Sequence, residues 1–214
     1  MPDPFDQSRY QVRFEWGADG LRRLAPADVI VVVDVLRFST TVTDAVARGE
    51  TFALDAAAHA VSINGARVAE SAARAGGIVL LGSLRNATAV AEAVLAEQAR
   101  RGERTSVTVI AAGELTSPEP GASLRYAVED QLGAGAIIDA LAALGIDHAS
   151  PEAALAGEAF RGLRGAVRHL LTASGSGQEL IARGQRDEVL AAAGLDERAE
   201  VPALRDGVFA ALVR

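Results

Sequence analysis

The sequence of 214 residues contains no cysteine, which excludes disulfide bonds, thiolate nucleophiles and cysteine-ligated metal sites. It has only three histidines, far apart in the chain, so a histidine-rich metal site is not expected. Aromatic residues make up 4% of the chain, whereas half of all residues are apolar. The core is therefore expected to consist mainly of alanine, valine, leucine and isoleucine.

Long apolar runs are also lacking, since none reaches the roughly 18 residues that a membrane-spanning helix needs. The polar start, Met1 to Arg9, carries Asp3 and Asp6 and lacks the basic-then-apolar order of a secretory signal. We therefore expect a cytoplasmic protein with no membrane partner.

Basic residues are outnumbered, with 21 Lys and Arg against 28 Asp and Glu, which gives a net charge of −7. A nucleic-acid-binding protein needs a basic face to meet phosphates, so nucleic acid is not an expected partner. A small anionic substrate remains compatible with this charge, because local arginines and helix N-termini bind anions on acidic proteins too.

The order of apolar segments predicts an α/β fold. Three nearly continuous apolar runs are typical of strands buried on both faces of a sheet: Val29–Val35, Ile78–Leu81 and Ser106–Ala112. Helical segments alternate with them, and those ending near Arg48, Ala75 and Arg101 are each followed by glycine. This alternation predicts a largely parallel sheet with helices on both faces.

The remaining segments complete the predicted domain, which spans residues 1–214. Tyr10–Trp16 alternates as an edge strand does, Thr51–Leu54 is a short strand candidate, and Asn64-Gly65 predicts a turn. Gly113–Ser123 is expected to be a loop with two prolines. Tyr126–Leu144 is expected to be a helix in which Gly133 and Gly135 allow close packing. Residues 150–214 are mainly helical, with a last short strand at Val201–Leu204.

Polar residues cluster where predicted strands end, which is where open parallel sheets bind ligands. In the segment DVLRFSTT, Asp34 leaves a buried strand, a costly position for a carboxylate that is neither paired nor holding a cation. Arg37 and the hydroxyls of Ser39, Thr40 and Thr41 follow at a helix start, which suggests an anion site. An Asp34–Arg37 ion pair with ordinary helix caps explains the spacing equally well.

Two further clusters are more ambiguous. Ser83, Arg85 and Asn86 in GSLRN lie between a strand and a helix, and their spacing alone favours a capped helix with one solvated arginine. Glu114 follows the strand that ends at Ala112, and Glu129-Asp130 could return to the same place. Such carboxylates can hold Mg²⁺, although spacing alone favours a solvated helix start for the Glu129-Asp130 pair.

Several longer segments, taken together and in order, are more specific than any of these clusters. They are VVVDVLRFSTTVTDAVARG, GSLRNATAVAEA, and AAGE followed by SLRYAVEDQLGAGAIIDAL. The start VRFEWGADGLRRL and the C-terminal SGSGQELIARG and VPALRDGVF accompany them. This series resembles the 2-phosphosulfolactate phosphatase family, and in its outer segments the actinobacterial branch of that family.

The resemblance implies a Mg²⁺-dependent phosphatase that releases phosphate from a small anionic phosphoester, 2-phosphosulfolactate on the way to coenzyme M or a similar phospho-acid. The implied catalytic residues are Asp34, Arg37 and Glu114. The implied metal ligands are Asp34, Glu129 and Asp130, with a metal-bound water or Asp34 itself as the nucleophile. The implied phosphate-binding residues are Ser39, Thr40, Thr41, Asn64, Gly65, Arg85 and Asn86.

One segment departs from the family pattern. Family members carry a longer stretch after the first helix, with a loop of the form Gly-x-Arg-Gly-Gly, whereas Gly49 to Asn64 is shorter here and contains no arginine. An arginine facing a phosphoryl group stabilises the transition state. The alternative prediction is therefore a weakened or inactive relative that binds a small anion or a protein partner. A homodimer is compatible with an alanine-rich α/β domain.

Overall fold

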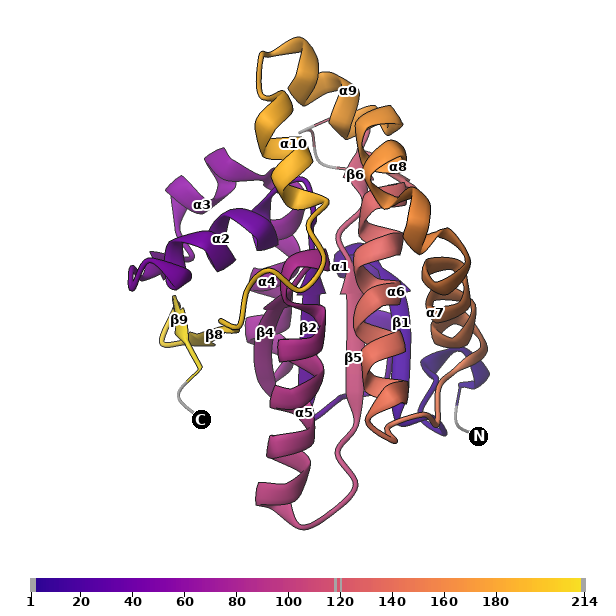
Figure 1. Ribbon diagram of the computed structural model, residues 1–214. Coiled ribbons are helices and arrows are strands. Elements are labelled where there is room, and N and C mark those ends of the chain that lie inside the picture. The colour runs from indigo at the N-terminus through magenta and orange to yellow at the C-terminus, as the bar shows by residue number, and fades with distance from the viewer. Residues whose placement is uncertain (1–2, 118, 120, 213–214) are drawn as a thin grey trace.

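The computed structural model describes residues 3–117, 119 and 121–212. Within them, seven strands form one mixed sheet in the order β1-β5-β2-β4-β8-β9-β3, with helices packed around it (Figure 1). The four strands on one side of this order are parallel: β1 (Val12–Trp16), β5 (Val107–Ala111), β2 (Val29–Val33) and β4 (Ile78–Gly82). The other three pair antiparallel: β8 (Pro202–Arg205), β9 (Val208–Ala211) and β3 (Phe52–Ala53). The predicted α/β class, with its largely parallel sheet, is confirmed.

Strand β2 lies at the centre of the parallel part, paired with β4 on one side and β5 on the other. All five of its residues are buried, as expected for a β-branched run covered on both faces. Its side chains alternate between two cores: Val29, Val31 and Val33 face one, and Ile30 and Val32 face the other. The edge position predicted for Tyr10–Trp16 is also confirmed, because β1 ends the sheet.

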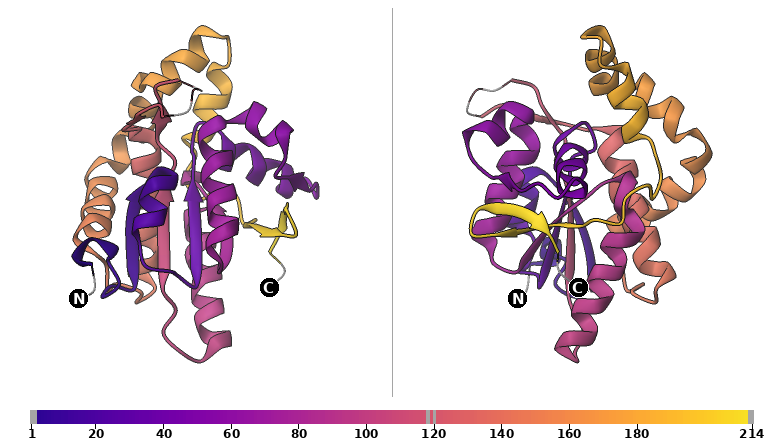
Figure 2. Two further views of the ribbon diagram at one scale, coloured as in Figure 1. Left: turned by 180° about the vertical axis from the view of Figure 1, so that it is seen from behind. Right: turned by 60° about the vertical axis from the view of Figure 1, so that its left-hand side comes forward.

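Helices cover both faces of the sheet (Figure 2). Helices α1 (Gly17–Arg23), α2 (Phe38–Ala47) and α4 (Ile63–Ala75) contribute to one core, and α5 (Ala87–Arg101) and α6 (Val128–Ala143) to the other. Helix α7 (Pro151–Leu163) packs against α6, where a Cβ on Gly135 would lie 2.2 Å from the carbonyl oxygen of Ala156. A Cβ on Gly133 would lie 2.6 Å from Val35 Cγ2, so both glycines serve close packing, as predicted.

The C-terminal part is helical, as expected, and stands above the carboxyl ends of the parallel strands (Figure 1). It consists of η3 (Arg164–Ala166), α8 (Val167–Ala173), α9 (Gly175–Ala182) and α10 (Arg186–Ala192). The chain then returns to the sheet as the hairpin β8–β9. Strand β8 confirms the last predicted strand, whereas β9 was not predicted.

Two local predictions need correction or extension. Asn64 and Gly65 do not form a turn, because both lie in the first turn of α4, after a short helix α3 (Ala56–Val61). The predicted loop 113–123 contains part of a small hairpin, β6 (Glu114–Leu115) with β7 (Leu124–Arg125). Its Pro118 and Pro120 lie outside the described residues. Short 3₁₀ helices complete the secondary structure, η1 (Pro4–Asp6) and η2 (Leu84–Asn86).

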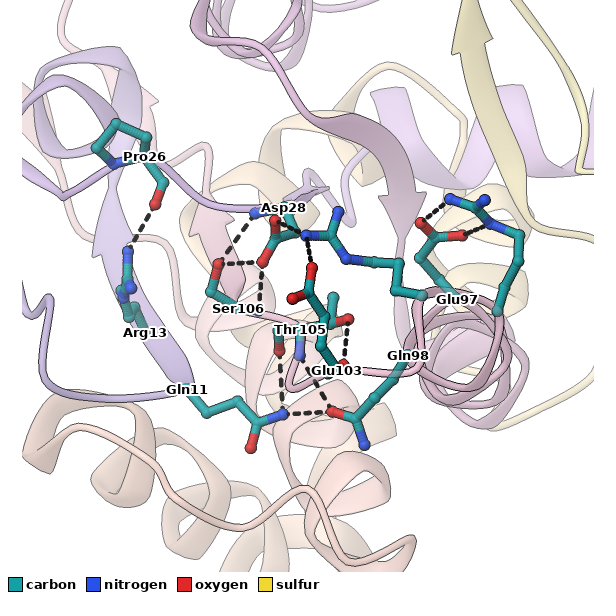
Figure 3. Close-up of polar contacts among 11 residues, drawn as sticks. Gln11, Arg13, Pro26, Asp28, Glu97, Gln98, Glu103, Thr105 and Ser106 are labelled. Carbon is teal, nitrogen blue, oxygen red and sulfur yellow. Dashed lines mark hydrogen bonds and ion pairs between the residues drawn. The ribbon is translucent and has the colours of Figure 1, made fainter.

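The strand starts, at the opposite end of the sheet, are joined by a polar network (Figure 3). Asp28 accepts hydrogen bonds from the backbone and hydroxyl of Ser106 at 2.8 and 2.7 Å and pairs with Arg101 at 2.7 Å. Gln11 donates to the carbonyl of Thr105 at 3.0 Å. These polar side chains bond to one another and connect the segments before the strands. The polar residues at the opposite, carboxyl ends of the strands are therefore the ones to consider for a ligand site. Within the described chain, no helix has the length and apolar character of a membrane span.

Candidate active site

Asp34 lies directly after β2 and is 3% exposed. Its Oδ1 accepts a hydrogen bond from the backbone N–H of Phe38, 3.1 Å away at the start of α2. Its Oδ2 accepts two more, from the Ser62 hydroxyl at 2.5 Å and from the backbone N–H of Gly65 at 3.0 Å, in the first turn of α4. One carboxylate thus joins two helix starts, where the helix dipoles favour negative charge.

Glu129 and Asp130, in the first turn of α6, are 2% and 3% exposed, so they are not the solvated helix start that spacing alone favours. Asp130 Oδ1 accepts from the backbone N–H of Val35 at 2.8 Å, and Oδ2 from that of Gly113 at 2.9 Å. Val35 follows β2 and Gly113 follows β5. Asp130 therefore holds two neighbouring strand ends together beside Asp34.

Burial and neighbouring charges raise the pKa of two of these carboxylates, Asp34 and Asp130. Burial, opposed by hydrogen bonds from Ser62 and Phe38 and reinforced by the charges of Glu114 and Glu129, raises the pKa of Asp34 to about 6. Burial also raises the pKa of Asp130 well above its usual range, and the charges of Asp34 and Glu129 add to this effect. Asp34 and Asp130 therefore favour a bound proton or a neighbouring cation. Together with Glu114 and Glu129, they are here called the acidic cluster.

Among the described residues, the acidic cluster does not form a closed cage for a metal ion. Every carboxylate oxygen of Asp34 and Asp130 already accepts a hydrogen bond, whereas the nearly buried carboxylate of Glu129 accepts none from the described residues. In the described part of the chain, no group of three or more His, Asp or Glu is placed to hold a metal ion. Mg²⁺ commonly uses one or two carboxylates, completed by water and substrate phosphate, and Glu129 fits that role.

A cleft of about 740 Å³ opens beside the acidic cluster. Its walls come from the turn after β2, the α3–α4 junction, the β6–β7 hairpin and α9. The predicted site residues Arg37, Asn64 and Glu114 line it, together with Ser62, Arg125 and Arg183. Asp34, Glu129 and Asp130 are not among the lining residues. Ser62 separates Asp34 from the cleft, because it lines the wall and donates to the buried carboxylate.

Glu114 is fixed in this wall by two side chains from other elements. Its Oε1 accepts from Asn64 Nδ2 and its Oε2 from the Ser176 hydroxyl, both at 3.1 Å. Asn64 Oδ1 in turn accepts from the backbone N–H of Leu115 at 3.2 Å. Helix α4, the β6–β7 hairpin and α9 therefore meet at one carboxylate that faces the cleft.

Arg37 lies in the turn between β2 and α2, which contains a cis peptide bond between Leu36 and Arg37. Among the described residues it forms no ion pair with Asp34. Its guanidinium instead pairs with Glu188 on α10 at 3.0 Å, and a third of the side chain is exposed. It lines the cleft and also a smaller pocket of about 220 Å³ between α2 and α10.

The hydroxyls predicted to hold phosphate are mostly turned inward. Ser39 donates to the carbonyl of Val32 at 3.0 Å, and Thr40 to that of Val35 at 2.8 Å. The backbone N–H of Ser39 is bonded to the carbonyl of Asp34 at 2.9 Å. These groups stabilise the turn. Thr40 and Thr41 also line the smaller pocket.

Arg85 and Asn86 are placed away from the cleft lining. Arg85 is buried and pairs with Asp44 on α2 at 2.5 Å and with Glu197 at 3.2 Å. Asn86 accepts from the backbone N–H of Ser83 at 2.9 Å and does not cap α5 with its side chain. Arg85 is thus neither the solvated arginine that spacing favours nor a wall residue of the cleft.

Sequence reasoning did not single out Ser62, Arg125 or Arg183. Asn64-Gly65 suggested a turn, so no helix start was expected at Ser62. In the structure, Ser62 is the N-cap of α4. Arg125 lies in SLRY, a segment used for the resemblance but assigned no role. Arg183 follows α9, and only the fold brings that helix over the strand ends.

A comparison with protein families decides the assignment. The family model described as 2-phosphosulpholactate phosphatase matches residues 55–207, more than half of the chain. The chain belongs to this family. No curated protein matches it. The family resemblance inferred from the sequence is thus confirmed, and the family is one of phosphatases. The match covers Asn64, Gly65, Arg85, Glu114 and the Glu129-Asp130 pair, and begins after the turn that carries Asp34 and Arg37.

Proposed function

We propose that this protein is a Mg²⁺-dependent phosphatase that hydrolyses a small anionic phosphate monoester, 2-phosphosulfolactate or a similar phospho-acid. The family match carries this proposal. The cleft supports it, because about 740 Å³ is within the range of small-molecule sites, and an arginine and a fixed carboxylate share its wall.

Arg37 is the first phosphate-binding group in this proposal. Its planar guanidinium can hold two phosphoryl oxygens through parallel charge-assisted bonds. It would exchange Glu188 for the substrate, and the exchange costs little, because ion pairs at exposed positions contribute only about 0–1 kcal/mol.

The acidic side chains have separate tasks. Asp34 is an unsuitable nucleophile, since it is 3% exposed and is separated from the cleft by Ser62, so water from the cleft attacks phosphorus. Glu114 faces the cleft and can accept a proton from that water as its bond to phosphorus forms. It can then return this proton to the ester oxygen as the bond between phosphorus and that oxygen breaks, so that an alcohol and inorganic phosphate leave. Glu129, with Asp34 beside it, would hold Mg²⁺, which neutralises charge on phosphoryl oxygens when bound.

A second candidate function is anion binding without hydrolysis. Two observations favour it. The Gly49–Asn64 connection supplies no arginine, and the oxygens of Asp34 and Asp130 are already engaged by the protein. Such a relative would bind the phosphoester in the cleft and release no phosphate.

The test is release of phosphate from 2-phosphosulfolactate and from a small panel of phospho-acids, with Mg²⁺ and with a chelator. We expect release that depends on Mg²⁺ and falls at least about tenfold in Arg37→Ala and in Glu114→Gln. No release from any substrate, in a protein that still binds inorganic phosphate, would favour the second candidate.

A further inference from the structure

Arg125 occupies a defined position in the wall of the cleft. It lies on β7 directly opposite Glu114 on β6, as its register partner in the antiparallel hairpin. Directly opposite residues in such a pair project from the same face. Both line the cleft, so the hairpin presents one guanidinium and one carboxylate to it side by side.

The guanidinium of Arg125 has no polar partner in the part of the chain that the structure describes. Among the described residues it forms no hydrogen bond and no ion pair, whereas Arg37 pairs with Glu188 and Arg183 pairs with Glu179 in the same walls. Glu114, the acid directly opposite it in the hairpin, is engaged by Asn64 and Ser176. Arg125 is therefore a cation of the wall without a counter-charge.

The neighbouring segment leaves room for this guanidinium. A Cβ built on Gly175, the first residue of α9, would lie 3.5 Å from Arg125 Nη2, so the guanidinium rests against a residue without a side chain. Its other side faces the cleft, where an anion can reach it.

We propose that Arg125 binds the phosphate of the ligand and supplies the guanidinium that the Gly49–Asn64 connection lacks. This inference rests on the proposed function for the identity of the ligand, a phosphate ester. A planar guanidinium with no other partner can give both of its parallel bonds to one phosphate. Arg37, by contrast, has to leave Glu188 first.

The test measures binding of inorganic phosphate by calorimetry for the full-length protein and for Arg125→Ala, Arg125→Lys and Arg168→Ala. Arg168 is the matched control, because it is an exposed arginine on α8 that does not line the cleft. We expect Arg125→Ala to raise Kd at least about tenfold, Arg125→Lys to raise it less, and Arg168→Ala to leave it unchanged. Phosphate binding that is absent in the native protein, or equal in Arg125→Ala and native protein, would overturn the proposal.

Kinetics separate this inference from the proposed function. If the native protein hydrolyses its substrate, Arg125→Ala should lower kcat/KM by about 10²–10³. Hydrolysis at the native rate in Arg125→Ala would refute the role of Arg125 alone. A native protein that binds phosphate through Arg125 but releases none from any ester would refute the proposed hydrolysis alone. Because Arg125 is exposed, Arg125→Ala should fold, and its thermal melting curve checks this.

Discussion

The Oδ2 atom of Asp34 lies 3.0 Å from the backbone nitrogen of Gly65, and a Cβ built on Gly65 would lie 2.4 Å from that same oxygen. The added atom would also lie 2.5 Å from Phe38 Cβ. Helix α4 can approach the end of β2 this closely only because position 65 has no side chain. The glycine is thus required by contact distance within a helix, where glycine is otherwise unfavourable.

Gly65→Ala should therefore destabilise the protein by about 1–3 kcal/mol, because the extra methyl group overfills a packed site, and should lower activity by displacing Asp34. Gly162→Ala is the control, since Gly162 lies in α7 and nothing is within 4 Å of its Cβ position. That variant should be unchanged or more stable by up to about 1 kcal/mol. Urea denaturation compares them, and equal stability of the two variants would contradict the contact argument.

Because the pKa of Asp34 is raised, its contribution to the free energy of unfolding should decrease as the pH rises. Its carboxyl has an ordinary pKa of 3.8 and a pKa of about 6 in the fold, so the folded state binds this proton more tightly. The stabilisation is complete below about pH 4 and is lost as the pH rises through 6, with a size on the order of 2–3 kcal/mol.

Asp34→Asn removes this titration. As the pH rises from 4 to 7, the native protein should lose stability relative to Asp34→Asn. The variant should be less stable than the native protein at both pH values, because its amide N–H₂ group faces the donors of Gly65 and Ser62. Denaturation at both pH values gives the difference. A difference that stays constant, or that grows with pH, would contradict a raised pKa at Asp34.

Arg85 should prove structural. Replacing it by Ala removes a buried guanidinium from Asp44 and Glu197, and Asp44 keeps its ion pair with Arg198. We expect a loss of about 2–3 kcal/mol in stability, which Mg²⁺ and phosphate do not restore, and a KM within about twofold of the native value. Melting curves and kinetics below the melting temperature test this. A raised KM with unchanged stability would instead support the phosphate-binding role that the family resemblance implied.

These residues show how far sequence reasoning reaches. Continuous β-branched runs such as Val29–Val33 specify strands buried on both faces, so the alternating sheet and its helices were predictable. The placement of Arg85 was not, because its partner Glu197 lies more than a hundred residues away and no local pattern predicts that contact. Arg125 and Ser176 reach one cleft only through a two-residue hairpin strand and the helix α9 above the sheet. Local pattern therefore predicted the layers and the strand-end position of Asp34, while the walls of the cleft depended on long-range packing.

The ion pair between Arg37 and Glu188 should oppose phosphate binding. Glu188→Gln removes the carboxylate that holds Arg37, so Arg37 becomes free to bind the ligand, and Kd for phosphate should fall about two- to fivefold. Stability should change by less than about 1 kcal/mol, because both side chains are substantially exposed. Glu158→Gln, which removes an exposed ion pair on α7, is the control and should leave Kd unchanged. Weaker phosphate binding by Glu188→Gln would show that the pair orients Arg37 for the ligand.

Replacing Glu129 should affect Mg²⁺ binding without lowering the stability of the protein. Its carboxylate is nearly buried, accepts no hydrogen bond from the described residues, and raises the pKa of both Asp34 and Asp130 by its charge. Glu129→Gln removes this repulsion, so without Mg²⁺ the variant should be as stable as the native protein, or more stable by up to about 1 kcal/mol. A buried carboxylate without a hydrogen-bond donor is costly unless a cation is bound beside it, so Glu129 is expected to bind one. Mg²⁺ at millimolar concentration should therefore raise the melting temperature of the native protein and not that of Glu129→Gln, since a ligand stabilises only the form that binds it.

Glu152→Gln is the matched control, an exposed acid in the first turn of α7, and should keep the native response. An equal rise with Mg²⁺ in native protein and Glu129→Gln would place any magnesium site elsewhere and remove Glu129 from the proposed mechanism.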